Sequence, residues 1–350
     1  MTERLYAALL AGVLLTGLIV AALVLPLPYV TYQPGLTVDV LGEEGGSEII
    51  QVSGHPAYRD DGQLRMTTVY VTQPGGRVSV FDAMRAWLSD EEAIYPYDSV
   101  YAPNETAEDS KTESAVQMVS SQDAATAVAL EQLGVDVKPV VEVLNVSAGF
   151  PADGKLEVRD VLRKVGTTTI TTPQDVVDAV DAAADGAPLV FEITRAGEPK
   201  SVSVTPKQVD GRWRIGVTTG PGYTFPFQVD VNIDPNIGGP SAGLMFSLAI
   251  YDTLTPGSLT DGATVAGTGT IDSEGKVGPI GGIQQKVVAA RDAGAELFLV
   301  PADNCAEALG APNGDMRLVR VATMPDALAS IKAWDADPDA DLPSCTKDAA

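Results

Sequence analysis

The feature that most constrains this chain is an uncharged, apolar stretch of 21 residues, 5–25, close to the N-terminus. A helix of that length crosses the hydrocarbon core of a bilayer, which is ~30 Å thick. Arg4 precedes the stretch, and the next Lys or Arg is Arg59. This bias in positive charge predicts a cytoplasmic N-terminus and an extracytoplasmic location for the bulk of the chain. Residues 1–27 are therefore predicted to be a single-pass transmembrane anchor in the cell membrane.

A cleaved signal peptide is the alternative interpretation of this stretch. Signal peptides have an apolar core of ~7–15 residues followed by a cleavage site with small residues. The apolar run is longer here, and residues 25–28 read Leu-Pro-Leu-Pro, which offers no such site. The uncleaved anchor is the favoured interpretation.

The charge of the chain limits its partners. The formal net charge is −24 over 350 residues. Nucleic acid binding is not expected, because it requires basic patches that neutralise phosphates. The same charge repels an anionic lipid surface, so membrane contact is expected only through the apolar N-terminal segment.

Metal-ligating residues are scarce. The chain contains one histidine, His55, and two cysteines, Cys305 and Cys345, which lack the spacing of zinc ligands. No metal and no cofactor are predicted. In an oxidising extracytoplasmic compartment the two cysteines could form a disulfide, although the sequence gives no distance between them.

Two glycine-rich turns each precede an apolar helical pattern and each deliver one reactive side chain. Residues 238–243 read Gly-Gly-Pro-Ser-Ala-Gly and place Ser241 at the start of a helix. Residues 279–286 read Pro-Ile-Gly-Gly-Ile-Gln-Gln-Lys and place Lys286 in the first turn of another. Taken singly, a helix-capping serine and a lysine that reaches solvent are ordinary. Together, in this order, they indicate a Ser–Lys nucleophilic dyad.

The chemistry of such a dyad requires an uncharged amine. A lysine amine has a reference pKa of ~10.4, so it becomes a base at neutral pH only when its pKa is lowered. The apolar neighbours Ile283, Ala289 and Ala290 predict that Lys286 faces the interior, where desolvation disfavours the charge. The positive end of the helix dipole acts in the same direction.

A smaller unit of alternating strands and one helix is predicted over residues 121–208. Its element order, with Ser-Ala-Gly-Phe-Pro-Ala at 147–152 before Asp-Val-Leu at 160–162, resembles a PDZ domain of the bacterial protease type. PDZ domains bind extended peptide ends by strand addition. The resemblance implies a carboxylate-binding loop near Leu133, Gly134 and Val135, and a groove walled by the helix that begins after Thr172. An unrelated α+β linker domain is the alternative.

Residues 225–335 resemble the proteolytic domain of Lon-type Ser–Lys endopeptidases. The resemblance rests on Gly239-Pro240-Ser241-Ala242-Gly243, on Thr268-Gly269, and on Pro279-Ile280-Gly281-Gly282 followed by Lys286. It implies that Ser241 is the nucleophile, that Lys286 is the general base and that Thr268 hydrogen-bonds the lysine, with Gly239 and Pro240 in supporting positions. The sequence departs from the family at Gly238, where an acidic residue is common, and at Gln284, where a charged residue is common.

These observations predict an α+β multidomain chain. Its expected parts are an anchor (1–27), an α/β region packing with the protease domain (28–120), a PDZ-like domain (121–208), a Lon-type domain (209–335) and an acidic tail (336–350). Within the second part, Ser79 is predicted to cap a helix over 80–88 that turns Phe81, Met84 and Leu88 inward, with Trp87 flanking.

The whole arrangement resembles the membrane-anchored PDZ–Lon-like proteases of bacteria. The function expected from it is an ATP-independent, membrane-tethered serine endopeptidase acting on polypeptide substrates or exposed C-termini. ATP independence is expected because Gly275-Lys276-Val277 lacks the spacing of a phosphate-binding loop. A homo-oligomer is a further expectation from the resemblance. A non-catalytic PDZ adaptor on a Lon-like platform, and an enzyme that only cleaves itself, are the alternatives.

Overall fold

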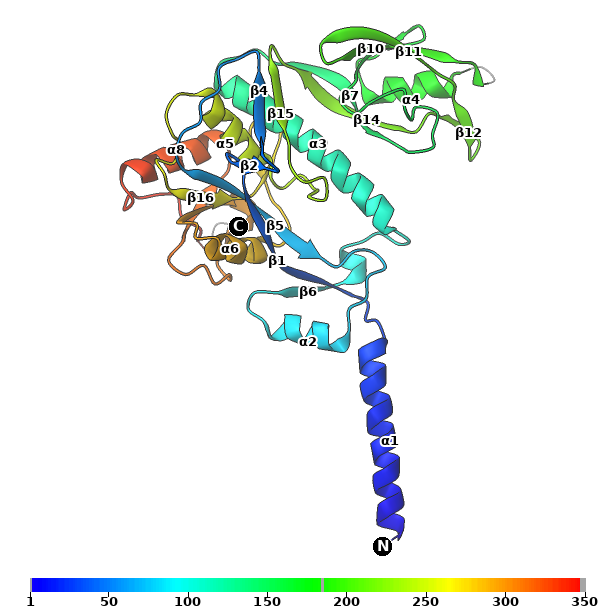
Figure 1. Ribbon diagram of the computed structural model, residues 1–350, viewed down its shortest axis with the longest axis vertical. Coiled ribbons are helices and arrows are strands. Elements are labelled where there is room, and N and C mark those ends of the chain that lie inside the picture. The colour runs from blue at the N-terminus through cyan, green and yellow to red at the C-terminus, as the bar shows by residue number, and fades with distance from the viewer. Residues whose placement is uncertain (1, 184–185, 347–350) are drawn as a thin grey trace.

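The computed structural model describes residues 2–183 and 186–346 and shows an α+β multidomain chain, as predicted. Figure 1 shows three parts: a projecting helix at the N-terminus, a mixed α/β body, and a smaller β-rich domain at the far end from the helix. The projecting helix is α1 (Thr2–Val24), which is long and apolar enough to cross a membrane. Its apolar segment, Thr2–Ala22, is not buried against the rest of the protein.

The body is built on a six-stranded mixed sheet in the order β20-β19-β16-β5-β1-β6. Strands β5, β16, β19 and β20 run parallel, and β1 and β6 are added antiparallel at one edge. The strands are β1 (Tyr29–Asp39), β5 (Gln63–Val71), β6 (Ala93–Pro96), β16 (Thr264–Gly267), β19 (Leu297–Pro301) and β20 (Arg317–Val321). The N-terminal region therefore supplies half of the sheet that the C-terminal region completes.

Helices cover both faces of this sheet. Because side chains alternate along a strand, Leu297 and Leu299 of β19 pack on one face, while Phe298 and Val300 pack on the other. The first face is covered by α3 (Ala107–Gln132), α5 (Gly243–Leu254) and α8 (Met324–Ala336). The second face is covered by α6 (Ile283–Asp292) and α7 (Cys305–Ala308). The result is a three-layer body with one helix layer on each side of the sheet.

A disulfide ties the C-terminal tail to the second helix layer. Cys305 at the start of α7 and Cys345 in the tail have an S–S distance of 2.07 Å and a Cα–Cα distance of 4.9 Å. Ser344 also bridges to Val319 of β20. The described part of the acidic tail is thus held against the body.

The smaller domain has an antiparallel sheet in the order β11-β10-β8-β7-β14 and a hydrophobic core of its own. Its elements are β7 (Lys138–Val146), β8 (Val161–Val165), α4 (Pro173–Asp181), β10 (Leu189–Arg195), β11 (Glu198–Val204) and β14 (Val217–Thr224). The chain enters this domain after α3 and leaves it through β14 into β15 (Gln228–Val231), which pairs with β4 (Ile50–Ser53) of the body. The domain is therefore an insertion between two parts of the body.

This insertion moves the expected boundaries. The second half of α3, expected in the small domain, packs in the core of the body through Ala125, Val128 and Leu130. Strand β14, expected in the C-terminal domain, is instead an edge strand of the smaller sheet, paired with β7. Figure 1 shows α3 running between the two parts.

Helix α2 (Val80–Leu88) begins where predicted but faces the other way. Ser79 caps it, in a capping box with Asp82. Phe81, Met84 and Leu88, expected to point inward, are 56%, 52% and 71% exposed, whereas Ala86 is 2% exposed. The helix lies close against β1 and β6, where its small residue fits and its large ones do not.

Short elements complete the chain. Among the described residues they include β2 (Glu43–Glu44), β3 (Ser47–Glu48), β9 (Thr168–Thr169), β12 (Lys207–Val209), β13 (Arg212–Arg214), β17 (Thr270–Ile271), β18 (Val277–Gly278) and the 3₁₀ turns Tyr97–Ser99 and Ala302–Asn304.

Candidate active site

Two helices from opposite faces of the body sheet bring their N-terminal ends to one point, the carboxyl end of β16. Strand β16 ends at Gly267, and Thr268 follows it directly. Ser241 lies one residue before Ala242, the N-cap of α5, and Lys286 lies in the first turn of α6. The carboxyl ends of parallel strands are where α/β folds place their ligand sites.

The three predicted polar residues are in hydrogen-bond contact. Lys286 Nζ lies 2.7 Å from Ser241 Oγ and 2.9 Å from Thr268 Oγ1. Thr268 Oγ1 donates its proton to the backbone oxygen of Ser241 at 3.0 Å, so toward the amine it acts as an acceptor. A neutral Lys286 can therefore donate to Thr268 and keep its lone pair for the hydroxyl proton of Ser241.

Burial explains why this amine can be neutral. Lys286 is 2% exposed and Thr268 is fully buried. Desolvation lowers the pKa of Lys286 from its ordinary value to about 7. The N-terminus of α6 adds a positive field that disfavours an ammonium ion at the same place. At neutral pH a large fraction of the amine is thus uncharged.

Glycine permits the close approach of these segments. Gly269 has a φ of +153°, and a Cβ built there would lie 2.6 Å from a methyl group of Val277. Its N–H donates to the Ser241 backbone oxygen at 2.9 Å. Gly282, the N-cap of α6, has a φ of +69°, and a Cβ there would lie 2.9 Å from Val69. Any larger residue at these positions would push the strand end or the helix start away.

The predicted supporting residues Gly239 and Pro240 are held by α3. The Gly239 N–H donates to the Ser114 backbone oxygen at 2.9 Å, and Ser121 Oγ donates to the Pro240 oxygen at 3.0 Å. A Cβ on Gly238 would lie 2.7 Å from that of Ser114. This contact leaves no room for the acidic side chain that Lon-type sequences often carry there. Sequence reasoning missed both serines, because they lie over 100 residues away and carry no motif.

A cleft of about 920 Å³ opens beside this loop. It lies between strands β1 and β5, the N-terminal half of α3 and the loop at Gly238; its lining includes Tyr32, Val71, Tyr101, Ser114 and Asn236. Tyr32 also borders Gly282 at the start of the lysine helix. The cleft thus borders the loop that carries the half-buried Ser241 and, through Tyr32, the start of the helix that carries Lys286.

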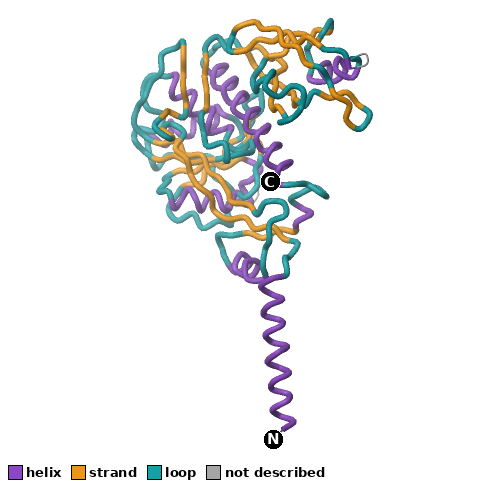
Figure 2. Tube along the Cα trace, turned by 45° about the vertical axis from the view of Figure 1, so that its right-hand side comes forward, coloured by secondary structure: helices purple, strands orange, loops and turns teal. Residues whose placement is uncertain are grey.

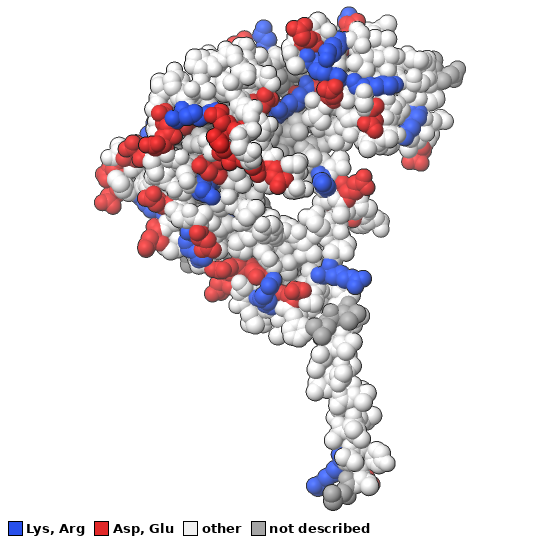
Figure 3. Space-filling model, in the orientation of Figure 1, with Lys and Arg blue, Asp and Glu red and all other residues white. Residues whose placement is uncertain are grey.

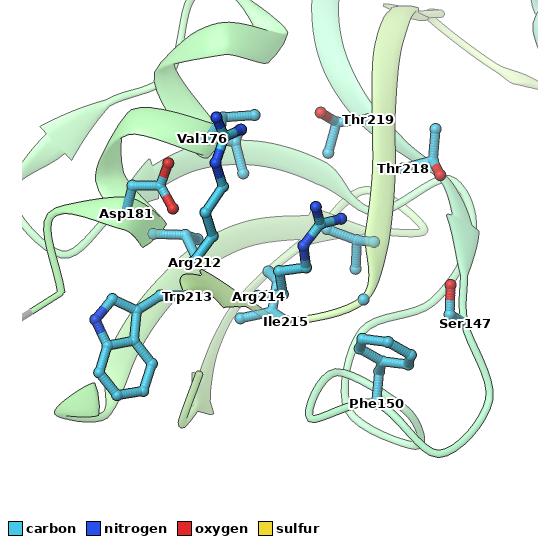
Figure 4. Close-up of a pocket in the computed structure, with 14 residues that line it drawn as sticks. Ser147, Phe150, Val176, Asp181, Arg212, Trp213, Arg214, Ile215, Thr218 and Thr219 are labelled. Carbon is cyan, nitrogen blue, oxygen red and sulfur yellow. The ribbon is translucent and has the colours of Figure 1, made fainter. Parts of the chain in front are cut away.

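A second cavity, of about 350 Å³, lies in the small domain between α4 and β14. Figure 4 shows Arg212 and Arg214 extending into the space between the helix and the strand, with Phe150 and Ser147 at the loop end. The segment 212–216, which comprises β13 and the two residues after it, therefore lines this cavity.

The predicted loop at Leu133, Gly134 and Val135 does not line this cavity. Leu133 and Val135 follow α3 and pack against the core of the body. The prediction failed because it placed the loop before the first strand of the domain, whereas the groove-edge strand here is β14, the last in sequence. Gly216, directly before strand 217–224, is the residue in the sequence that marks this turn. It has a φ of +79°, and a Cβ there would overlap Phe150, so the position requires glycine.

The geometry described above coincides with a family match. Residues 235–331 match the Lon protease (S16) C-terminal proteolytic domain. This chain carries a Lon-type proteolytic domain. That match contains Ser241, Thr268 and Lys286, and S16 is a family of serine peptidases. Residues 116–205 match the PDZ domain, so the Lon-type domain is preceded by a PDZ domain, as the sequence predicted.

Individual relatives agree with the match to the Lon-type domain. The chain is 45% identical over 85 residues to Lon protease 1 of Herpetosiphon aurantiacus, covering 24% of this chain and 10% of that protein. It is 32% identical over 134 residues to Lon protease of Campylobacter jejuni, covering 37% of this chain and 15% of that protein. The matched segments therefore span only a small part of these relatives. Among solved structures, the PDZ domain of the SdrC-like protein of Listeria innocua matches with a TM-score of 0.22 and 20% identity, covering 23% of this chain and 92% of that one.

Proposed function

We propose that this chain is an ATP-independent serine endopeptidase, tethered to the membrane by α1, with Ser241 as nucleophile and Lys286 as general base. The observation that carries the proposal is the 2.7 Å contact between the Ser241 hydroxyl and an amine that is 2% exposed and has a pKa lowered to about 7. A buried amine in contact with a hydroxyl is costly for a purely structural lysine and useful for a base.

Acyl transfer follows from this arrangement. Neutral Lys286 accepts the proton of Ser241 as Oγ attacks the substrate carbonyl, and the ammonium then gives that proton to the departing amine. Water then enters, and Lys286 takes one of its protons as the water oxygen adds to the acyl carbon. The ammonium returns that proton to Ser241 Oγ as the ester C–O bond breaks, and the acyl group leaves as a carboxylic acid. A pKa of about 7 suits both directions of proton transfer at neutral pH.

Backbone donors are available for the oxyanion. The N–H groups of Ser241 and Ala242 make no hydrogen bond with any of the described residues, and they lie at the positive end of α5. The Ser241 carbonyl is held by two donors, Thr268 Oγ1 and the Gly269 N–H, so the peptide that carries the nucleophile cannot turn. Preorganised donors of this kind supply a large part of the stabilisation of tetrahedral intermediates.

The PDZ domain is proposed to recruit polypeptide ends. Its edge strand β14 offers a free side for strand addition beside the groove of α4. Strand β14 continues through β15 toward the loop that carries Ser241, so a bound chain end lies on an element that leads to the active site.

The proposed reaction uses no nucleotide, because the segment most similar to a phosphate-binding loop has a different structure. Gly275 and Lys276 form the turn between β17 and β18, and Lys276 bridges to Thr323. This turn does not lead into a helix, as a phosphate-binding loop would. We therefore propose loose segments and exposed termini as substrates, because they need no unfolding before cleavage.

The test is proteolysis by the full-length chain in nanodiscs, using casein and quenched peptides without ATP. We expect cleavage by the wild type and none by Ser241→Ala or Lys286→Ala, with circular dichroism unchanged in both. A fluorophosphonate should label Ser241 in the wild type only. Cleavage by both variants would remove the dyad, and an inactive, unlabelled wild type that still binds peptides would favour an adaptor.

A further inference from the structure

Helix α2 carries an apolar face that is turned away from the protein. Phe81, Met84 and Leu88 recur at spacings of three and four residues, and Trp87 lies beside them; they are 56%, 52%, 71% and 76% exposed. At 3.6 residues per turn these four side chains occupy an arc of about 120°. The opposite side presents Ala86 to the body. A soluble helix would have the reverse orientation, with its large apolar side chains inward.

Geometry places this face at the end of α1. Helix α1 has 23 residues, a length of about 35 Å, so its last turn reaches the boundary of a ~30 Å hydrocarbon core. Leu27 then donates its N–H to the Val78 oxygen at 2.9 Å, and α2 begins two residues after Val78. Only residues 25–27 separate the end of α1 from this bridge, a reach of about 10 Å.

Figures 1 and 2 both show α2 beside the inner end of α1. If α1 crosses the bilayer, α2 must lie at the level of the lipid headgroups, and no folded partner fits between the helix and the lipid. Figure 3 shows charged side chains only at the N-terminal tip of the described stem of α1, and the rest of its coloured surface is white.

The side chains around α2 have the chemistry of a membrane interface. Trp87 and the partly exposed Tyr29 are amphipathic aromatics, which gather at the headgroup level. Arg85 lies at the border of the apolar face with its side chain 59% exposed, and it pairs with Glu92 at 3.4 Å. Arg77, just before the helix, is exposed as well. An apolar face bordered by arginine is the pattern of helices that lie in the plane of the interface.

We propose that α2 is an interfacial helix that inserts Phe81, Met84, Trp87 and Leu88 into the outer edge of the bilayer in which α1 is anchored. This inference rests on the proposed anchoring by α1 and adds a second point of membrane contact. The two contacts hold the body in one orientation, because a single tether would let it rotate and tilt freely. The binding is hydrophobic, so it needs no anionic lipid, consistent with the acidic character of the chain.

The test uses the full-length chain in phosphatidylcholine nanodiscs with an environment-sensitive NBD label. Leu88→Cys provides the site, and Val158→Cys, 44% exposed in the PDZ domain, is the matched control. The described native cysteines are paired in a disulfide. We expect the Leu88 probe to emit at shorter wavelength, to be several-fold less accessible to iodide than the control, and to be quenched by lipids with a nitroxide near the headgroup. A second chain with Phe81→Cys and Trp87→Asp should show an aqueous probe, because the charge releases the helix.

Carbonate extraction of the same samples separates the two proposals. If the chain resists extraction while the Leu88 probe is as aqueous as the control, interfacial docking is wrong and anchoring stands. If the probe is shielded but quenched only by labels on another copy of the chain, the face is a subunit contact and docking is wrong. If carbonate extracts the chain, anchoring fails and docking falls with it.

Discussion

Two buried clusters of ionisable groups in this chain compensate for the cost of desolvation in different ways. Around Lys286 the buried side chains are hydrogen-bonded to one another: the amine contacts Ser241 Oγ and Thr268 Oγ1, and Thr268 Oγ1 donates to the Ser241 backbone oxygen. At the junction between α3 and the PDZ domain, Glu142 and Asp123 are 3% and 6% exposed. Among the described residues, Glu142 Oε1, Asp123 Oδ2 and Arg159 Nε lack a hydrogen-bond partner.

The pKa shifts of the two clusters have the same main cause and opposite consequences. Desolvation lowers the pKa of Lys286 and, together with the neighbouring Asp123, raises the pKa of Glu142. Burial favours the neutral form of both groups, but only Lys286 contacts a nucleophile, and a cleft opens beside the loop that carries that nucleophile. Burial alone therefore does not define a catalytic site; a reactive partner and access for substrate do. At the junction, Arg159 pairs with Asp123 at 3.3 Å and offsets part of the cost.

The largest expected effect comes from removing the amine and keeping its volume. Lys286→Met should lower kcat/KM at least about 10³-fold, because no base remains for Ser241. The same change should raise the free energy of unfolding at pH 7 by about 2 kcal/mol or more, since an apolar side chain avoids the desolvation cost. Peptide cleavage and urea unfolding measure the two effects. A variant that loses both activity and stability would make the lysine structural.

The next effect is on pH dependence. Because the amine must be unprotonated and its pKa is about 7, kcat/KM should fall about tenfold per pH unit below 7 and level off above it. Initial rates between pH 5 and 9 test this. A profile that keeps rising to pH 10 would show that Lys286 has an ordinary pKa.

A smaller effect is expected from Thr268→Val, which keeps the shape and removes the hydroxyl. The amine and the Ser241 carbonyl each lose one hydrogen bond, so the dyad is less well aligned. We expect kcat to fall about 10–100-fold with KM nearly unchanged. The control variant Thr268→Ser keeps the hydroxyl and should therefore keep a kcat close to that of the wild type. An unchanged kcat in the valine variant would mean that burial alone positions the amine.

The smallest effect is on the junction cluster. Glu142 has a folded pKa above its unfolded value, so the folded chain binds the extra proton and stability falls as pH rises above about 4.5. Lys286 is present in both chains, so its own contribution to the pH dependence cancels in the comparison. Between pH 5 and 7, the free energy of unfolding of the wild type should fall by up to about 1.4 kcal/mol per pH unit because of Glu142. Glu142→Gln should remove this decline. Urea unfolding of the wild type and of Glu142→Gln at these pH values measures the difference. If the free energies of unfolding of the two proteins change with pH in parallel, the prediction is wrong.

The proteolytic motifs were readable from the sequence because they are local. A glycine-rich turn, a reactive residue and an apolar helix lie within a few residues of each other around Ser241 and again around Lys286. These patterns predicted both helix starts and the inward lysine. Their 2.7 Å meeting at the end of β16 depends on packing from two faces of a sheet, which no local pattern encodes.

Long-range pairing and orientation were not readable in the same way. Strand 63–71 alternates as an ordinary strand, and nothing in it indicates pairing with β16, about 200 residues later. The apolar spacing of α2 correctly predicted a helix with one apolar face. Periodicity gives the existence of such a face but not what covers it, so Phe81 and Leu88 were assigned to the wrong side.

The insertion of the PDZ domain also sets the order in which the molecule can be completed. Thr67 of β5 donates its hydroxyl proton to the Gly267 oxygen at 3.3 Å, across 200 residues of chain. A nascent polypeptide can close the PDZ sheet as soon as β14 is made, yet β5 must wait for β16, and Lys286 is made later still. Because contacts this far apart in sequence form slowly, the candidate active site is assembled last, after the PDZ domain that is proposed to recruit its substrates.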